Sequence, residues 1–169
     1  EGTYPLPEAQ LDRFLMKILV GFPSRDELTG ILERTIQREE AELHQVLTRE
    51  QILELRSVCR GVLIAQHVRD FAVDLVMATQ PDHPQAHPLA KKYIRYGSSP
   101  RGAQAMLECG RVLALMHGRF HLSTGDVRHL APSVMRHRII LNFDAHADGQ
   151  TPETVLSAII ESVAAAKAH

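Results

Sequence analysis

The sequence of 169 residues contains no tryptophan, and aromatic residues make up only 5% of it. Its core must therefore be aliphatic, which fits the 44% of residues that are hydrophobic. The only two cysteines, Cys59 and Cys109, stand far apart among apolar residues. This spacing excludes a clustered-thiol metal or redox motif and favours buried, reduced thiols. No apolar run approaches the length of about 18 residues that a membrane-spanning helix needs, so we expect no membrane segment.

An excess of positive or negative charge is also missing, because the net charge is −1 at pH 7. Sequence-independent binding to nucleic acid depends on an excess of Lys and Arg that neutralises phosphates. The balance therefore argues against a DNA-binding helical domain, and we expect no nucleic-acid partner. The histidine pairs His83/His87 and His117/His121 have no Cys or carboxylate at a spacing that completes a tetrahedral zinc set, so we predict no metal site.

Helical signals dominate the sequence from Pro23 onward. Two capping boxes, Ser24 with Glu27 and Thr48 with Gln51, open the first two helices, and the first is expected over about 24–45. Apolar residues at helical spacing predict further helices at 65–80, at 100–117, from 123 and from 151. Three prolines predict a loop at 81–90. Five or six helices with short connections predict a compact, mainly α-helical bundle.

One segment does not fit a helical protein. Residues 15–22, Leu-Met-Lys-Ile-Leu-Val-Gly-Phe, form a short apolar run with β-branched members, which is typical of a buried strand. A single strand cannot satisfy its own backbone groups, and the chain supplies almost no other strand candidates. We therefore expect that a sheet-bearing domain is missing. Without it, residues 15–22 should fold back over the bundle, fray, or pair with another copy.

Arg13 is the first candidate functional residue. It lies just ahead of the apolar run and is flanked by Leu11 and Phe14, whose packing could present it rigidly at a domain edge. An arginine presented in this way can reach into the phosphate site of a neighbouring subunit. The alternative is a local ion pair with Asp12 or Glu8.

Arg101 is the second candidate. Ser99 and Pro100 place it in the first turn of a helix, where free N–H groups and the positive end of the helix dipole favour anions. An arginine at this end is locally unfavourable unless an anion is present that both can share. The alternative is a solvated arginine in an ordinary capped helix.

Three segments of the chain keep the order and spacing of a known family. Residues 1–14, EGTYPLPEAQLDRF, resemble the segment that follows sensor 1 in MoxR-family AAA+ ATPases. Residues 93–101, YIRYGSSPR, resemble the sensor 2 segment, and residues 130–143 are similar to the C-terminal part of that family. The resemblance implies a helical AAA+ lid domain at 23–169. It also implies a short remnant of the α/β ATPase core at 1–22.

The resemblance also assigns roles to the candidate residues. Arg13 would be the arginine finger, acting in trans on ATP bound by the adjacent subunit of a ring. Arg101 would be the sensor 2 arginine, acting in cis on the γ-phosphate, with Ser99 and Pro100 beside the nucleotide. The Walker A, Walker B and sensor 1 residues of the family are not in this sequence. We therefore expect the chain alone to bind no nucleotide and to be inactive, with ATP and Mg²⁺ as cofactors of the full-length parent.

The family implies partners as well. These are the missing AAA+ core, a homo-oligomeric ring expected to be a hexamer, and a protein with a von Willebrand factor A domain, all in the cytoplasm. The parent would couple ATP hydrolysis to chaperone-like remodelling of client proteins, or to cofactor or metal insertion into them. The alternative is a stand-alone helical interaction module with no nucleotide role.

Overall fold

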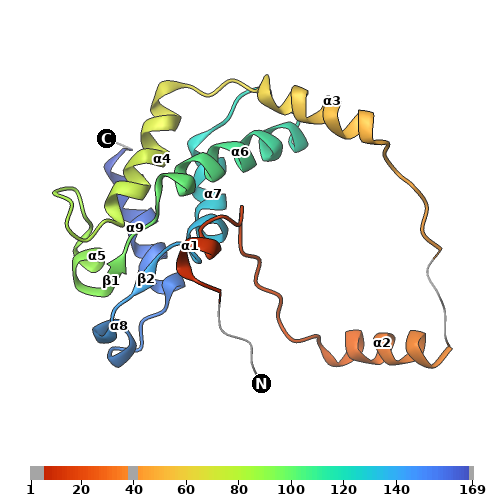
Figure 1. Ribbon diagram of the computed structural model, residues 1–169, viewed down its shortest axis with the longest axis horizontal. Coiled ribbons are helices and arrows are strands. Elements are labelled where there is room, and N and C mark those ends of the chain that lie inside the picture. The colour runs from red at the N-terminus through yellow and green to blue at the C-terminus, as the bar shows by residue number, and fades with distance from the viewer. Residues whose placement is uncertain (1–5, 38–41, 168–169) are drawn as a thin grey trace. The chain divides into compact units, whose positions relative to one another are not determined.

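The computed structural model describes residues 6–37 and 42–167 (Figure 1). Contacts divide the chain into two units, one of Glu1–Lys17 with Val58–His169 and the other of Ile18–Ser57. All the buried hydrophobic side chains of the described residues belong to the first unit. Residues 6–17 thus group with the helices of the C-terminal part. The expected boundary between residues 22 and 23 remains a prediction.

Four helices form the core of the first unit. They are α4 (Gln66–Ala78), α6 (Pro100–Met116), α7 (Thr124–Met135) and α9 (Pro152–Ala166), and they pack against one another (Figure 1). As the composition predicted, aliphatic side chains fill most of the interior, and the largest fully buried residues include Phe71, Leu75, Met106, Met135, Leu156 and Ile159. The prediction of a mainly α-helical bundle is confirmed. No helix in the described part of the chain is both long and apolar enough to cross a membrane.

Short elements lie together at one end of this bundle (Figure 1). They are α5 (Pro88–Tyr93), β1 (Ile94–Tyr96), β2 (Ile140–Leu141) and α8 (Phe143–Ala147), and β1 pairs antiparallel with β2. The predicted loop at 81–90 is wrong at its end, because α5 begins at Pro88. The His87 ring caps this helix by accepting the N–H of Leu89, and a proline suits the first helical position.

The predicted helix starts are confirmed. Ser99 caps α6, Thr151 caps α9, and Ser123 forms a capping box with Asp126 at the start of α7. Helix α6 ends before Gly118, which has a φ of 68°. Glycine is favoured there because a side chain strains the backbone in this left-handed region. Local sequence therefore fixes where these helices begin and where α6 ends.

Asp126 anchors the start of α7. Its side chain is 7% exposed and accepts hydrogen bonds from Arg119 Nη2 at 2.6 Å and from Arg119 Nη1 at 2.8 Å. It also accepts the backbone N–H of Ser123 at 2.9 Å and the Ser123 hydroxyl at 2.7 Å. The hydrogen bonds from Arg119 are the main reason that the pKa of Asp126 lies far below its ordinary value, although burial opposes them. The carboxylate is therefore ionised at neutral pH.

We expect Asp126→Ala to lower the free energy of unfolding by about 2–3 kcal/mol at pH 7, because a helix cap and charged hydrogen bonds are lost. Since the folded-state pKa of Asp126 is depressed, its stabilisation is present above the ordinary pKa of about 4. The stabilisation is lost as the pH falls through the folded-state pKa. Urea unfolding at several pH values should show the difference from wild type narrowing below pH of about 4. Exposed Asp82→Ala is the control, and equal losses in both variants would contradict this account.

The second unit contains α2 (Arg25–Gln37) and most of α3 (Arg49–Arg60). Both predicted capping boxes are present, since Glu27 accepts the Ser24 N–H at 2.8 Å and Gln51 accepts the Thr48 N–H at 2.8 Å. The predicted extension of the first helix to residue 45 is wrong, because residues 42–48 have no helical structure. Residues 38–41 lie outside the described residues. The apolar side chains on α2 are exposed in this chain, including Leu28, Ile31, Leu32 and Ile36.

Residues 15–22 do not form a strand. Met16 packs against the core of the first unit, and the Lys17 N–H donates to the Ser133 carbonyl at 2.8 Å. Residues 18–22 are exposed and make no backbone hydrogen bond among the described residues. The segment thus forms no strand with any part of the chain that the structure describes, as expected for a strand-like run without its sheet. Met16 and Lys17 fold back onto the bundle, which is one of the expected outcomes. Residues 18–22 have no backbone partner among the described residues.

Candidate functional site

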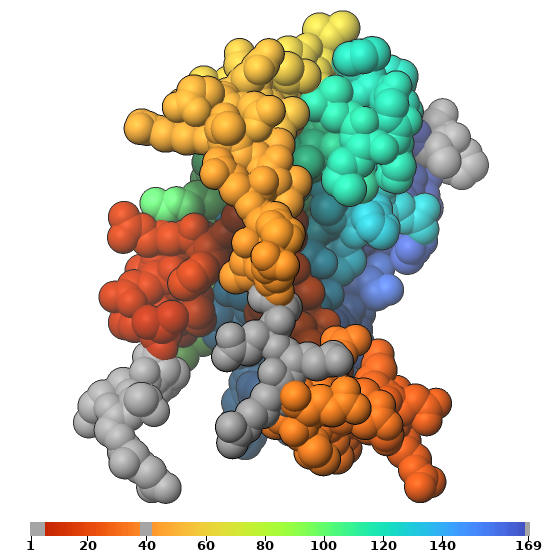
Figure 2. Space-filling view, turned by 90° about the vertical axis from the view of Figure 1, so that its right-hand side faces the viewer, coloured from red at the N-terminus to blue at the C-terminus, as the bar shows by residue number. Residues whose placement is uncertain are grey.

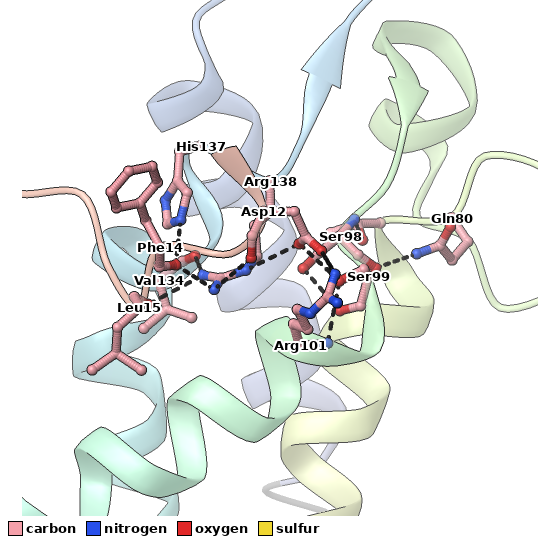
Figure 3. A network of polar contacts seen from close by, with 11 residues as sticks. Asp12, Phe14, Leu15, Gln80, Ser98, Ser99, Arg101, Val134, His137 and Arg138 are labelled. Carbon is pink, nitrogen blue, oxygen red and sulfur yellow. Dashed lines mark hydrogen bonds and ion pairs between the residues drawn. The ribbon is translucent and has the colours of Figure 1, made fainter. Parts of the chain in front are cut away.

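Three segments distant in sequence meet around the carboxylate of Asp12 (Figure 3). The first is residues 12–15, called the finger segment after the role expected of Arg13, which follows the short helix α1 (Glu8–Leu11). The second is the loop 97–101 at the start of α6, and the third is residues 134–138 at the end of α7. The Asp12 side chain is only 18% exposed, with cationic groups on both sides. All three segments belong to the first unit.

The loop side of the site binds Asp12 with two residues. The Ser99 hydroxyl lies 2.8 and 2.9 Å from the two carboxylate oxygens, and Arg101 Nη1 donates to Oδ2 at 2.8 Å. Ser99 also caps α6 by accepting the Arg101 N–H at 3.2 Å. The Arg101 side chain is 56% exposed, so its guanidinium remains accessible to solvent. The anion expected beside Arg101 is therefore supplied, in this chain, by Asp12.

Arg138 binds the finger segment from the other side. Its side chain is 2% exposed and donates to the carbonyls of Phe14 at 2.6 Å, Leu15 at 3.2 Å and Asp12 at 3.3 Å. It also donates to the Val134 carbonyl within α7. Its Nε lies 3.3 Å from Asp12 Oδ1, close enough for an ion pair but not aligned for a hydrogen bond. One buried guanidinium thus fixes the backbone on both sides of Arg13.

Burial and charge set the protonation of this site. Partial burial acts to raise the pKa of Asp12, but hydrogen bonds from Arg101 and Ser99 and the charge of Arg138 outweigh it and hold the pKa below its ordinary value. Burial lowers the pKa of His137, whose Nε2 lies 3.0 Å from the Phe14 carbonyl oxygen. A neutral ring that donates its Nε2–H suits this contact. The site therefore holds an ionised Asp12 at neutral pH.

The loop that carries Ser99 and Arg101 is held rigidly. The buried Ser98 donates its N–H to the Thr79 hydroxyl at 3.0 Å, and its carbonyl accepts from Gln80 Nε2 at 2.6 Å. A Cβ at Gly97 would lie 2.5 Å from the Thr79 carbonyl oxygen, and a Cβ at Gly102 would lie 2.2 Å from Ser98 Oγ. Gly97 thus allows the loop to pack closely against the end of α4, and Gly102 leaves room for the Ser98 side chain beside the first turn of α6. This packing positions the backbone from which the Arg101 side chain extends.

Arg13 stands exposed at the edge of the site. Among the described residues it makes no ion pair and no side-chain hydrogen bond, so the local pair with Asp12 or Glu8 is not formed. Phe14 is 55% exposed, so the expected packing of Arg13 between two buried apolar residues is wrong. The finger segment is positioned by Arg138 through backbone carbonyls instead. The hydrogen bonds from Arg138 to these carbonyls could not be predicted from the sequence around Arg13.

A surface groove of about 500 Å³ runs beside these residues. It is lined by Glu8 and Asp12 from the N-terminal part, Tyr96 and Ser99 from the β1 region, and His137. Figure 2 shows the N-terminal residues in red beside the green residues of the β1 region. Solvent and small solutes can therefore reach the polar groups around Asp12.

Comparison with known proteins shows consistent similarity. Residues 87–159, which include Ser99, Arg101 and Arg138, match the AAA lid domain family. The chain is 36% identical over 164 residues to the chaperone MoxR1 of Mycobacterium tuberculosis, covering 97% of the chain and 43% of that protein. It is 32% identical over 162 residues to the protein MoxR of Paracoccus denitrificans, covering 84% of the chain and 45% of that protein.

The fold is also similar to a crystal structure from Cytophaga hutchinsonii of a protein assigned as an ATPase. The TM-score is 0.86 with 29% sequence identity, over 95% of this chain and 49% of that one. The chain thus spans less than half the length of each of these relatives. Asp12 and Arg13 lie outside residues 87–159, which match the lid domain family. They nevertheless belong to the same structural unit as those residues.

Proposed function

The chain belongs to the MoxR-type AAA+ ATPases and carries their lid domain, and on this premise we propose that it forms the lid part of an ATP-driven, chaperone-like remodelling protein. The observation that carries this proposal is the binding of a carboxylate by Arg101 and Ser99 at the start of α6. These two side chains form a rigid, accessible anion site. A sensor 2 arginine requires such a site to bind the γ-phosphate of ATP.

The donor set suits a phosphate. A guanidinium and a hydroxyl that bind both oxygens of a carboxylate can bind two oxygens of a phosphoryl group in the same way. In the proposed role, Arg101 acts in cis on the γ-phosphate, with Ser99 and Pro100 shaping the turn beside it. Arg101 would stabilise negative charge that is redistributed during phosphoryl transfer. ATP with Mg²⁺ would supply the transferred phosphoryl group.

Arg13 takes the second role in this proposal, as an arginine finger acting in trans. Its exposure and its lack of a side-chain partner among residues 6–37 and 42–167 leave the guanidinium available to a neighbouring subunit. The same residues contain no group of three His, Cys, Asp or Glu side chains placed to hold a metal ion. In the full-length protein, Mg²⁺ is proposed to be held by the AAA+ core, whose Walker residues are not in this sequence.

The proposed assembly is a homo-oligomeric ring, expected to be a hexamer in the cytoplasm, in which each lid contacts the AAA+ core of its own protein. Client maturation, by cofactor or metal insertion, and a von Willebrand factor A domain partner belong to the same proposal. The second candidate is a stand-alone helical interaction module. Its support is the exposed apolar side chains of α2, which would suit contact with another protein.

The test is ATP binding and turnover by this chain, alone and mixed with a separately expressed core that contains the Walker motifs. We expect no binding by the chain alone and turnover by the mixture, because the two arginines need a bound nucleotide to act on. Gel filtration establishes whether the two parts associate. Tight ATP binding by the chain alone, or a stable complex without turnover, would contradict the proposal.

A further inference from the structure

The two proposed functional arginines are joined through Asp12. Arg13 follows Asp12 directly, and both lie in a tight turn after α1, with the Asp12 N–H donating to the Glu8 carbonyl at 3.1 Å and the Arg13 N–H to the Gln10 carbonyl at 3.2 Å. No flexible residue separates the carboxylate that binds Arg101 from the backbone that carries the proposed finger. A displacement of the Asp12 carboxylate would therefore be transmitted to Arg13.

The two cationic contacts of Asp12 differ in accessibility. Arg138 is almost fully buried and binds mostly through backbone carbonyls, so it can keep its hold on the finger segment. Arg101 is more than half exposed and binds Asp12 through a single guanidinium nitrogen. An ion pair of this kind is weak and exchangeable. The contact with Arg101 is therefore the one that a competing anion can replace.

We propose that Asp12 is a positioning residue that transmits the state of Arg101 to Arg13. This inference rests on the proposed function. Without a γ-phosphate, Asp12 holds Arg101 and Ser99. When a γ-phosphate binds these donors in cis, it competes with the carboxylate of Asp12, and the finger segment turns about its anchor at Arg138. The lid of one subunit would thereby set the position of the arginine that this subunit offers to its neighbour.

The test compares wild type with Asp12→Asn in the full-length ATPase, by measuring nucleotide binding with a fluorescent ATP analogue and measuring steady-state turnover. We expect binding to be unchanged or up to about fivefold tighter, because a competitor for Arg101 is weakened. We expect turnover to fall by a factor of about ten to a hundred, because Arg13 is no longer placed correctly. A merely structural role would weaken both and lower the melting temperature.

Asp12→Glu is the second variant, because it keeps a charge beside Arg138. This variant should also bind nucleotide normally but hydrolyse ATP slowly, since the longer side chain shifts the carboxylate relative to Arg13. Exposed Asp82→Asn is the matched control and should behave like wild type. Wild-type turnover in both Asp12 variants would overturn the inference, as would a parallel loss of binding and turnover.

The Arg101→Ala variant distinguishes a failure of the inference about Asp12 from a failure of the proposed function. If Arg101→Ala abolishes turnover while both Asp12 variants match wild type, the role of Asp12 is refuted and the sensor 2 role of Arg101 stands. If Arg101→Ala leaves turnover unchanged, the proposed function itself fails, and the inference fails with it.

Discussion

On the proposed function, Arg13→Ala in the full-length protein is expected to lower ATP turnover by a factor of about 10³ or more while nucleotide binding stays near the wild-type value. An arginine finger supplied by a neighbour acts on the charge that develops in the transition state, and such residues contribute factors of about 10³–10⁵. The side chain is exposed and makes no contact that the fold needs in the described residues. The melting temperature should therefore not change.

Two further variants sharpen this prediction. Arg13→Lys keeps the charge but lacks the planar fork, so it should recover only a small part of the turnover. Arg69→Ala removes an exposed arginine on α4 whose side-chain hydrogen bond is to Gln66, and it should retain full activity. A loss of turnover in Arg69→Ala as large as in Arg13→Ala would show that turnover depends on surface charge in general and not on Arg13. Normal turnover in Arg13→Ala would remove the finger role.

Arg101→Ala should lower turnover by a factor of about 10²–10³, the usual effect of removing one donor from a developing charge. The variant should lose affinity for ATP more than for ADP, because Arg101 is proposed to contact only the γ-phosphate. Its fold should stay intact, since an arginine in the first turn of α6 is unfavourable for the helix dipole. Titration of both nucleotides, together with thermal unfolding, measures these effects.

Equal losses of ATP and ADP affinity in Arg101→Ala would contradict a γ-phosphate contact. A large drop in melting temperature would point to a structural role at the start of α6. Arg69→Ala again serves as the control for the removal of one positive charge from the same unit. Unchanged turnover in Arg101→Ala would favour the interaction-module alternative.

The helical bundle could be predicted from sequence because its signals are local. The apolar residues Val68, Ala72, Leu75 and Val76 recur at helical spacing, and all four are buried in α4. Ser99 with Pro100 marks the start of α6, and Gly118 lies just beyond its end. Caps and periodicity involve residues within a turn or two of each other. They can therefore be read without knowledge of the tertiary fold.

The central contacts of the site could not be read in this way. Asp12 meets Ser99 and Arg101 across 87 and 89 positions of sequence, and Arg138 meets Phe14 across 124. Neither Asp12 nor Arg138 was a candidate functional residue, because each looks like an ordinary charged residue among its neighbours. The one available signal was the arginine at the positive end of a helix, which required an anion but did not identify it.

The short β1 and β2 strands were missed for a related reason. Ile94–Tyr96 and Ile140–Leu141 are too short to show an alternating pattern, and they pair only because the fold brings them together. Residues 15–22 show the same dependence from the other side, since their strand-like composition forms no strand among the described residues. Strand structure depends on a partner as much as on the sequence of the strand itself.

The cis and trans roles proposed for the two arginines are tested most directly by mixing Arg13→Ala and Arg101→Ala subunits in equal amounts before the proposed ring assembles. If Arg101 acts in cis and Arg13 in trans, a complete site forms wherever an Arg13→Ala subunit binds ATP beside an Arg101→Ala neighbour, at about one site in four for random assembly. We predict that the mixture regains turnover well above either variant, up to about that fraction of the wild-type value, although each variant alone has little activity. A mixture as inactive as its components, with assembly confirmed by gel filtration, would contradict the assignment of the two arginines to different subunits.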